Sequence, residues 1–147
     1  MDREKILFRG KCIDEDEWVE GCLIYQGDHW LILQDESRLH PMDVPYIDDF
    51  GYINGRADPV VLETVGQYTG LTDKNGKKIF EGDILEFSDR MVSVFWHAHL
   101  GCWDSNFLKF TSKENGREDM SPCHWSYRAK VVGNIYDNPE LLKGGKK

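Results

Sequence analysis

The sequence has no long hydrophobic run, and none of its apolar stretches approaches the ~20 residues that a membrane-spanning helix needs. Residues Met1–Lys5 alternate acidic and basic side chains and lack the basic-then-apolar layout of a secretory signal peptide. We therefore expect a cytoplasmic protein with no membrane partner. An apolar period of 3.6 residues is also missing over any stretch long enough for a good helix, which favours short strands.

Motifs of common catalytic sites are also missing. No Gly-x-Ser-x-Gly sequence is present, and no glycine-rich stretch ends in the Gly-Lys-Ser/Thr that cradles a phosphate. Cys123 and His124 are adjacent, but neighbours on a strand point to opposite faces, so we expect no thiolate–imidazole pair. These observations predict a protein that is not an enzyme and uses no cofactor.

Cysteine is scarce, with Cys12, Cys22, Cys102 and Cys123 among 147 residues. Disulfide frameworks are typical of small exported scaffolds. A chain of this length buries roughly 68–70% of the surface that its unfolded form exposes, so it needs no covalent staples. We expect reduced thiols that are mostly buried.

Basic charge is scarce in the first half of the chain. Residues 1–63 carry 6 Lys and Arg against 15 Asp and Glu, and the whole chain has a net charge of −8. An acidic surface repels phosphate backbones, so nucleic-acid binding is disfavoured. It stays open as an alternative because Lys74, Lys77 and Lys78 flank a predicted hairpin, and small β-barrels do bind single strands.

Short β-favouring runs separated by turn residues are abundant instead. Ile6–Phe8, Trp18–Tyr25 and Trp30–Leu33 predict an N-terminal β meander. Residues 34–58 then hold two of the five prolines, Pro41 and Pro45, and form the longest irregular stretch. Such a loop is usually a functional excursion or partly mobile. We predict at most a short strand or turn near Tyr46-Ile47 or Tyr52-Ile53.

The second half predicts a small β-barrel or sandwich. Asp73–Gly76 is a strong hairpin signal, because Asn75 and Gly76 accept the positive φ of tight turns. Further turns are predicted at Glu81–Asp83 and Glu114–Arg117, and one helical turn at Pro139–Leu142. The predicted strands are residues 60–62, 64–68, 77–80, 84–87, 91–96, 106–110 and 131–136.

The segment Glu63–Ile84 resembles the hallmark of the YopX family, small proteins encoded by bacteriophages and prophages. Phe8–Lys11, Trp18–Gly21 and Gly133–Leu142 match the family in the same order. The resemblance implies a mainly β fold, in which an N-terminal β region precedes an SH3-like small barrel. Together with the strand pattern, we predict ranges of 1–59 for the N-terminal region with its irregular loop 34–58, 60–138 for the barrel, and 139–147 for a short turn and frayed tail. The resemblance also implies a bacterial host cytoplasm, and it supplies no activity.

Most hallmark residues suit turns or core, and their role, structural or binding, is left open. They are Thr64, Gly66, Gln67, Tyr68, Thr69, Gly70, Asp73, Asn75, Gly76, Glu81, Gly82 and Asp83. The adjacent Gln67, Tyr68 and Thr69 are the least easily explained. Gln67 is interpreted either as a buried side chain bonded to backbone or, with its two neighbours, as part of a recognition surface.

A metal site is the strongest enzymatic alternative, although we expect none. Zn²⁺ accepts imidazole and thiolate ligands, but the spacing of the candidates matches no established finger or ribbon. The candidate ligands are His97 and His99, placed on one face of a predicted strand, with Cys102, Cys123 and His124.

The sequence thus favours a non-enzymatic phage accessory protein that binds a protein partner. Small SH3-like barrels bind through aromatic-lined grooves or exposed edges, and Trp103, Trp125 and Tyr127 are the candidate groove residues. Exposed edges would also permit a homo-oligomer. A nucleic-acid accessory protein is the first alternative, and a metal-dependent enzyme is the second.

Overall fold

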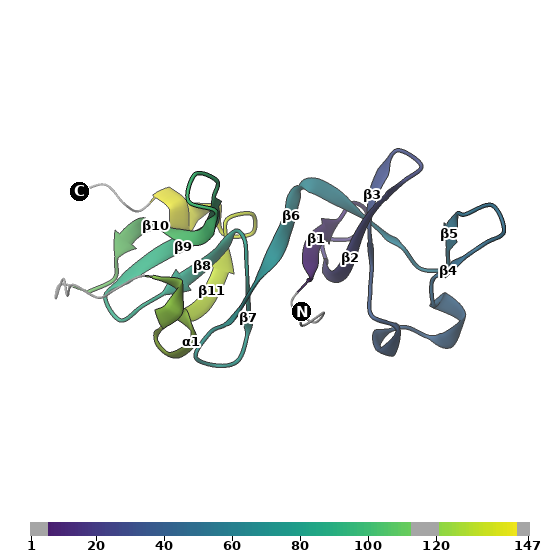
Figure 1. Cartoon of the computed structure of the whole chain (residues 1–147). Helices are drawn as coiled ribbons and strands as arrows, with labels where there is room; N and C mark the ends of the chain where they lie inside the picture. Colours follow the sequence, from purple (N-terminus) through teal and green to yellow (C-terminus); the bar gives the residue numbers. More distant parts are fainter. Residues whose placement is uncertain (1–5, 113–120, 144–147) are drawn as a thin grey trace. The chain divides into compact units, whose positions relative to one another are not determined.

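The computed structural model describes residues 6–112 and 121–143 (Figure 1). The chain is mainly β, as predicted, and forms two compact units, residues 1–67 and 68–147. The strand β6 (Asp58–Thr72) contributes to both units. No helix in the described ranges is long and apolar enough to cross a membrane.

The first unit contains a small closed β-barrel. Its strands are β1 (Phe8–Cys12), β2 (Trp18–Gln26), β3 (His29–Leu33) and the first part of β6. Antiparallel pairings run from β1 to β2, from β2 to β3, from β3 to β6 and from β6 back to β1, which closes the ring. Val19, Ile32 and Val60 form its buried core. This closed ring lies earlier in the chain than the barrel that we predicted over residues 60–138.

The strand β1 begins two residues later than predicted and continues through Gly10 to Cys12. A Cβ at Gly10 would lie 2.9 Å from the Cβ of Val60, so only glycine lets β1 approach β6 this closely. The register of the β1–β6 pair shifts between Arg9 and Lys11. Thr64 satisfies the backbone there, because its Oγ1 accepts from the Lys11 N–H and donates to the Val61 carbonyl.

The irregular stretch between β3 and β6 contains a small hairpin. Two 3-10 turns, Glu36–Arg38 and Pro41–Asp43, precede β4 (Tyr46–Ile47), which pairs antiparallel with β5 (Ile53–Asn54). The short strand predicted near these residues is confirmed. Figure 1 shows β4 and β5 extending away from β1, β2 and β3.

The second unit is built on a four-stranded antiparallel sheet in the order β10-β9-β8-β11. These strands are β8 (Asp83–Glu86), β9 (Arg90–His97), β10 (Cys102–Phe110) and β11 (Lys130–Asn134). The end of β6 pairs with β7 (Lys78–Phe80). The two runs predicted at residues 60–62 and 64–68 form this single β6, and the predicted turn at 114–117 and tail at 144–147 lie outside the described residues.

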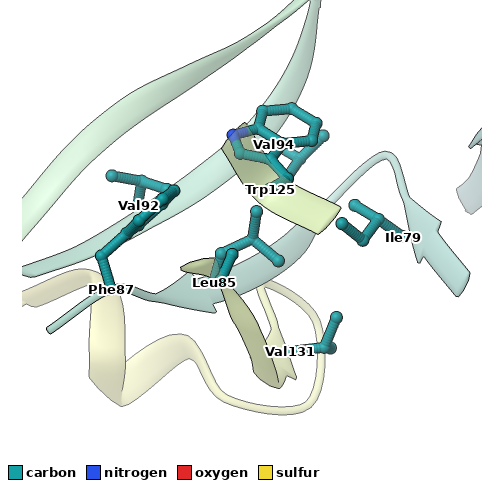
Figure 2. Packing of buried hydrophobic residues seen from close by; sticks show 8 residues of the cluster. Ile79, Leu85, Phe87, Val92, Val94, Trp125 and Val131 are labelled. Carbon is teal, nitrogen blue, oxygen red and sulfur yellow. The ribbon is translucent and has the colours of Figure 1, made fainter. Parts of the chain in front are cut away.

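Short helical turns complete the second unit. The 3-10 turn Pro122–His124 leads directly into α1 (Trp125–Arg128). The helical turn predicted at Pro139–Leu142 is confirmed as the 3-10 turn Pro139–Lys143. Trp125 on α1 is fully buried among side chains of the sheet, as Figure 2 shows. The core consists of Ile79, Leu85, Phe87, Val92, Val94, Trp125, Ala129 and Val131. Trp125 is therefore a core residue, and its predicted role in a binding groove is wrong.

Candidate functional site

Most hallmark residues form turns that connect strands. Asp73 is buried, and its Oδ1 accepts from the N–H groups of Asn75 and Lys77. Its Oδ2 accepts from the Val131 N–H at 2.9 Å. Burial acts to raise the pKa of Asp73, but the hydrogen bonds from Val131, Lys77 and Asn75 outweigh it and lower the pKa. Asp73 thus ties the β6–β7 turn to β11 as a carboxylate.

The second hallmark turn connects three strands. Gly82 has a φ of +87°, donates its N–H to the Val94 carbonyl and accepts the Ile135 N–H. Asp83 is buried and accepts from the Phe80 N–H at 2.8 Å. Glu81, which lies between Phe80 and Gly82 in the sequence, is half-buried. Gly82 favours this conformation because glycine has no Cβ to oppose a positive φ.

Gln67, Tyr68 and Thr69 do not lie together on one surface. Tyr68 is buried with its ring centroid 5.5 Å from that of Phe80, and Thr69 donates its hydroxyl to the Ile79 carbonyl. Gln67 is exposed on β6, opposite Phe8 of β1. The interpretation of Gln67 as a buried side chain is therefore wrong, and Tyr68 and Thr69 have structural contacts.

The remaining hallmark residues also belong to strand irregularities or turns. Gly66 is buried where β6 pairs with Arg9 of β1. Gly70 has a φ of +84° at the register shift of the β6–β7 pair, and Gly76 has a φ of +80° in the hairpin turn. Lys74 and Lys77 on this turn are exposed.

The metal-ligand candidates are not assembled into one site. His97 ends β9, and His99 lies in the turn that follows, so the two do not share a strand face as predicted. Across the described ranges, no three His, Cys, Asp or Glu side chains are grouped so that they could hold a metal ion. Of the candidate ligands, Cys123 and His124 do meet, within the 3-10 turn Pro122–His124 rather than on a strand.

The cysteines are free and less buried than predicted. Cys22, Cys102 and Cys123 are exposed, and Cys12 is half-buried, with a pKa raised by burial and by Asp58. The expectation of mostly buried thiols is therefore wrong. Of the other predicted groove residues, Trp103 packs against the core and Tyr127 is exposed.

Five highly exposed large apolar side chains of the first unit lie between residues 42 and 52, on the β4–β5 hairpin and just before it. Phe50 at its tip is 86% exposed and Ile47 is 71% exposed. We call this set the hairpin surface, and it consists of Met42, Tyr46, Ile47, Phe50 and Tyr52. Exposed apolar side chains that gather on one surface mark interaction sites, so the hairpin surface is a candidate for such a role.

The hairpin is held by side-chain hydrogen bonds rather than by a core. Asp48 accepts from the N–H groups of Phe50 and Tyr52 through Oδ1, and from the Asn54 amide through Oδ2. The bond from Asn54 and those from the Tyr52, Phe50 and Gly51 N–H groups lower the pKa of Asp48. Asp48 is therefore a carboxylate at neutral pH, and it fixes the shape of the tip.

The base of the hairpin is fixed in two ways. The Gln26 side chain of β2 donates to the Ile53 carbonyl at 3.0 Å and accepts the Ile53 N–H at 2.8 Å, so it acts as a strand partner. Gly55 has a φ of +89°, and a Cβ there would lie 2.6 Å from the Val44 carbonyl oxygen. The sequence signal for the hairpin tip is the Asp-x-Phe-Gly-Tyr pattern at residues 48–52, an Asx turn before a glycine, beside the positions where we predicted a short strand or turn.

The comparisons with known proteins agree with this fold. The family model described as "YopX protein" matches residues 8–143. The chain belongs to the YopX family. The YopX resemblance inferred from Glu63–Ile84 is thereby confirmed over nearly the whole chain.

A solved structure is similar over the same length. The crystal structure of protein EF1440 from Enterococcus faecalis is 26% identical to this YopX-family chain, with a TM-score of 0.52. The alignment covers 94% of this chain and 99% of that one. No curated protein matches the chain.

Proposed function

We propose that this YopX-family chain is a phage or prophage accessory protein of the bacterial host cytoplasm that acts as a protein-interaction module. The contact surface in this proposal is the hairpin surface. The observation that carries it is Phe50, a large apolar side chain 86% exposed at the tip of a hairpin fixed by Asp48. We retain the proposal that the second unit is SH3-like, supported by its antiparallel sheet and the short 3-10 turn before the last strand.

The hairpin surface has the composition of a binding hot spot. Aromatic and methionine side chains are enriched at protein interfaces, where a few of them contribute most of the binding free energy. Tyr46 and Tyr52 offer large rigid rings with a polar end, which suits an interface that is exposed to water before binding. Their hairpin is ordered by Asp48 and Gln26, so binding would immobilise little additional backbone.

The charge around the hairpin indicates the chemistry of the partner. Residues 34–58 contain six acidic and two basic residues, and Asp48 and Asp49 directly precede Phe50. Arg56 is paired with Asp58 at 3.2 Å, so it offers little free positive charge. A complementary partner is a protein with an apolar recess for Phe50 bordered by Lys or Arg side chains.

The test places a photo-crosslinking amino acid at position 50 of the full chain and irradiates the protein in host lysate. Leu100 provides the matched control position, because it is an exposed apolar residue in a turn of the other unit. We expect a discrete crosslinked protein from position 50 and none from position 100. The purified partner should then bind the unlabelled chain at least ~30-fold more weakly after Phe50→Ser, since hot-spot truncations cost about 2 kcal/mol or more.

Three outcomes contradict the proposal. Equal crosslinking from positions 50 and 100 would mean nonspecific capture. Binding that survives Phe50→Ser would move the contact elsewhere. A crosslinked product that is a second copy of the chain, together with concentration-dependent dimerisation in ultracentrifugation, would show that the hairpin surface is a self-association surface.

A further inference from the structure

Three polar side chains meet at the start of the 3-10 turn Pro122–His124 in the second unit. The Cys123 Sγ lies 3.3 Å from Nδ1 of His124 and 2.9 Å from Oγ of Ser121. Ser121 Oγ also lies 3.1 Å from His124 Nδ1, so each of the three atoms is within hydrogen-bond distance of the other two. The thiol is exposed, whereas Ser121 and His124 are half-buried.

The surrounding structure holds this group in place. The His124 N–H donates to the Ser121 carbonyl at 3.0 Å, which closes the turn. Trp125, the next residue, is fully buried in the core and anchors the turn to the sheet. The His124 ring packs edge-on to the ring of Tyr127, with centroids 5.5 Å apart. The contact between thiol and imidazole is thus part of an anchored turn.

A thiol in contact with an imidazole is the arrangement that activates cysteine. The thiolate is the nucleophilic form, and a neighbouring base that accepts the proton increases its population. Here the proton can pass from Sγ to Nδ1 of His124 along the 3.3 Å contact, and the Ser121 hydroxyl can donate to the resulting thiolate. The exposed sulfur can be approached from solvent.

We propose that Cys123 is a modification site, a nucleophilic thiol activated by His124 that is S-thiolated by low-molecular-weight disulfides. The Cys123 thiolate attacks one sulfur of the disulfide, a new S–S bond forms to Cys123, and the original S–S bond breaks. The released thiolate takes up the proton held by His124. Cys123 is oxidised and the released half of the disulfide is reduced, so no other reagent is needed.

The chain contains its own matched controls. Cys22 and Cys102 are exposed thiols and, in the described part of the chain, have no side-chain hydrogen bond to a histidine. Half-buried Cys12 reports on loosening of the first unit. Tryptophan fluorescence reports on the folding of both units, because two of the five tryptophans lie in the first unit and three in the second.

The experiment treats the full reduced protein with oxidised glutathione at neutral pH and measures the modification of each cysteine by peptide mass spectrometry. We expect Cys123 to react about 10-fold faster than Cys22 and Cys102, because His124 lies where it can accept the thiol proton as Sγ attacks. In His124→Gln, the Cys123 rate should fall to that of Cys22, with the rates of Cys22 and Cys102 unchanged. Ser121→Ala should produce a smaller decrease.

Two results would overturn the proposal. One is a wild-type Cys123 rate within twofold of those of Cys22 and Cys102. The other is a fast Cys123 rate that is unchanged in a folded His124→Gln protein, because activation would then not come from the imidazole. If fluorescence shows that His124→Gln does not fold, the wild-type protein alone tests the proposal, through the ratio of the Cys123 modification rate to the rates of Cys22 and Cys102.

Discussion

The Asp73 carboxylate accepts a hydrogen bond at 2.9 Å from the backbone N–H of Val131, 58 residues further along the chain. The same carboxylate closes its own turn through the N–H groups of Asn75 and Lys77. The Lys74 N–H also donates to the Ala129 carbonyl, so the turn and the last strand are joined from both sides. A residue that the sequence indicates as a turn former therefore also holds the second unit together.

Replacement of Asp73 by alanine should destabilise the second unit by about 2–4 kcal/mol. The substitution leaves buried N–H groups without their charged acceptor, and hydrogen bonds to charged groups contribute about 1.5–3 kcal/mol each. Urea unfolding followed by tryptophan fluorescence measures the change. Asp49→Ala, at an exposed aspartate of the hairpin, is the control and should leave stability within about 0.5 kcal/mol of wild type.

Asp73 also predicts a dependence of stability on pH. Its pKa in the folded protein is lowered from the reference value of 3.8, so its ionised form stabilises the fold at pH values above 3.8. This contribution should be lost as the pH falls below 3.8 and through the folded pKa. Unfolding of wild type and Asp73→Asn should therefore differ clearly near pH 6 and converge in acid. A difference that stays constant with pH would show that the charge of Asp73 is not responsible.

Gly21 on β2 should tolerate no side chain. A Cβ at this position would lie 1.9 Å from the Leu33 carbonyl oxygen, which is backbone and cannot rotate away. We expect Gly21→Ala to lower the free energy of unfolding of the first unit by at least about 2 kcal/mol, through displacement of β3 from β2. Cys22→Ala, one residue away at an exposed site, should have little effect in the same thermal melts.

Gln26 should control the order of the hairpin surface without controlling the fold. Gln26→Ala removes both hydrogen bonds to Ile53, so amide hydrogen exchange at Tyr46–Asn54 should accelerate while the melting temperature changes little. Gln34→Ala removes a bond to Asp58 outside the hairpin and serves as the control. Unchanged exchange in Gln26→Ala would show that the Gln26 side chain does not order the hairpin.

Strands and turns could be predicted where local chemistry decides them. Gly76 and Gly82 take a positive φ at little cost, so their turns were identifiable without knowledge of their neighbours. The positive φ that we predicted for Asn75 is wrong, because Asp28 is the non-glycine residue with a positive φ in the described part of the chain. Runs such as Trp18–Tyr25 favour strands for an equally local reason. The hairpin at residues 46–54 was located only approximately, because its order comes from the side chains of Asp48 and Gln26 rather than from strand propensity.

Burial and side-chain meeting points could not be predicted in the same way. The sequence did not distinguish the fully buried Trp125 from exposed aromatics, because burial depends on which strands pack over each ring. Cys123 and His124 were assigned to opposite faces of a strand, whereas a 3-10 turn brings their side chains together. The error followed from the wrong local geometry, since alternation of side chains holds only in extended backbone.

The sequence by itself determined the family, the mainly β fold and the principal turns, because these depend on residue types at short spacing. The tertiary structure alone decided that β6 closes a ring with β1, that Gln67 is exposed while Tyr68 is buried, and that Ser121, Cys123 and His124 converge. Strand closure and burial arise from pairings between residues far apart in the chain, so the alternation of apolar and polar residues within one strand does not determine them. The meeting of Ser121, Cys123 and His124 depends on a 3-10 turn, which the same alternation did not predict.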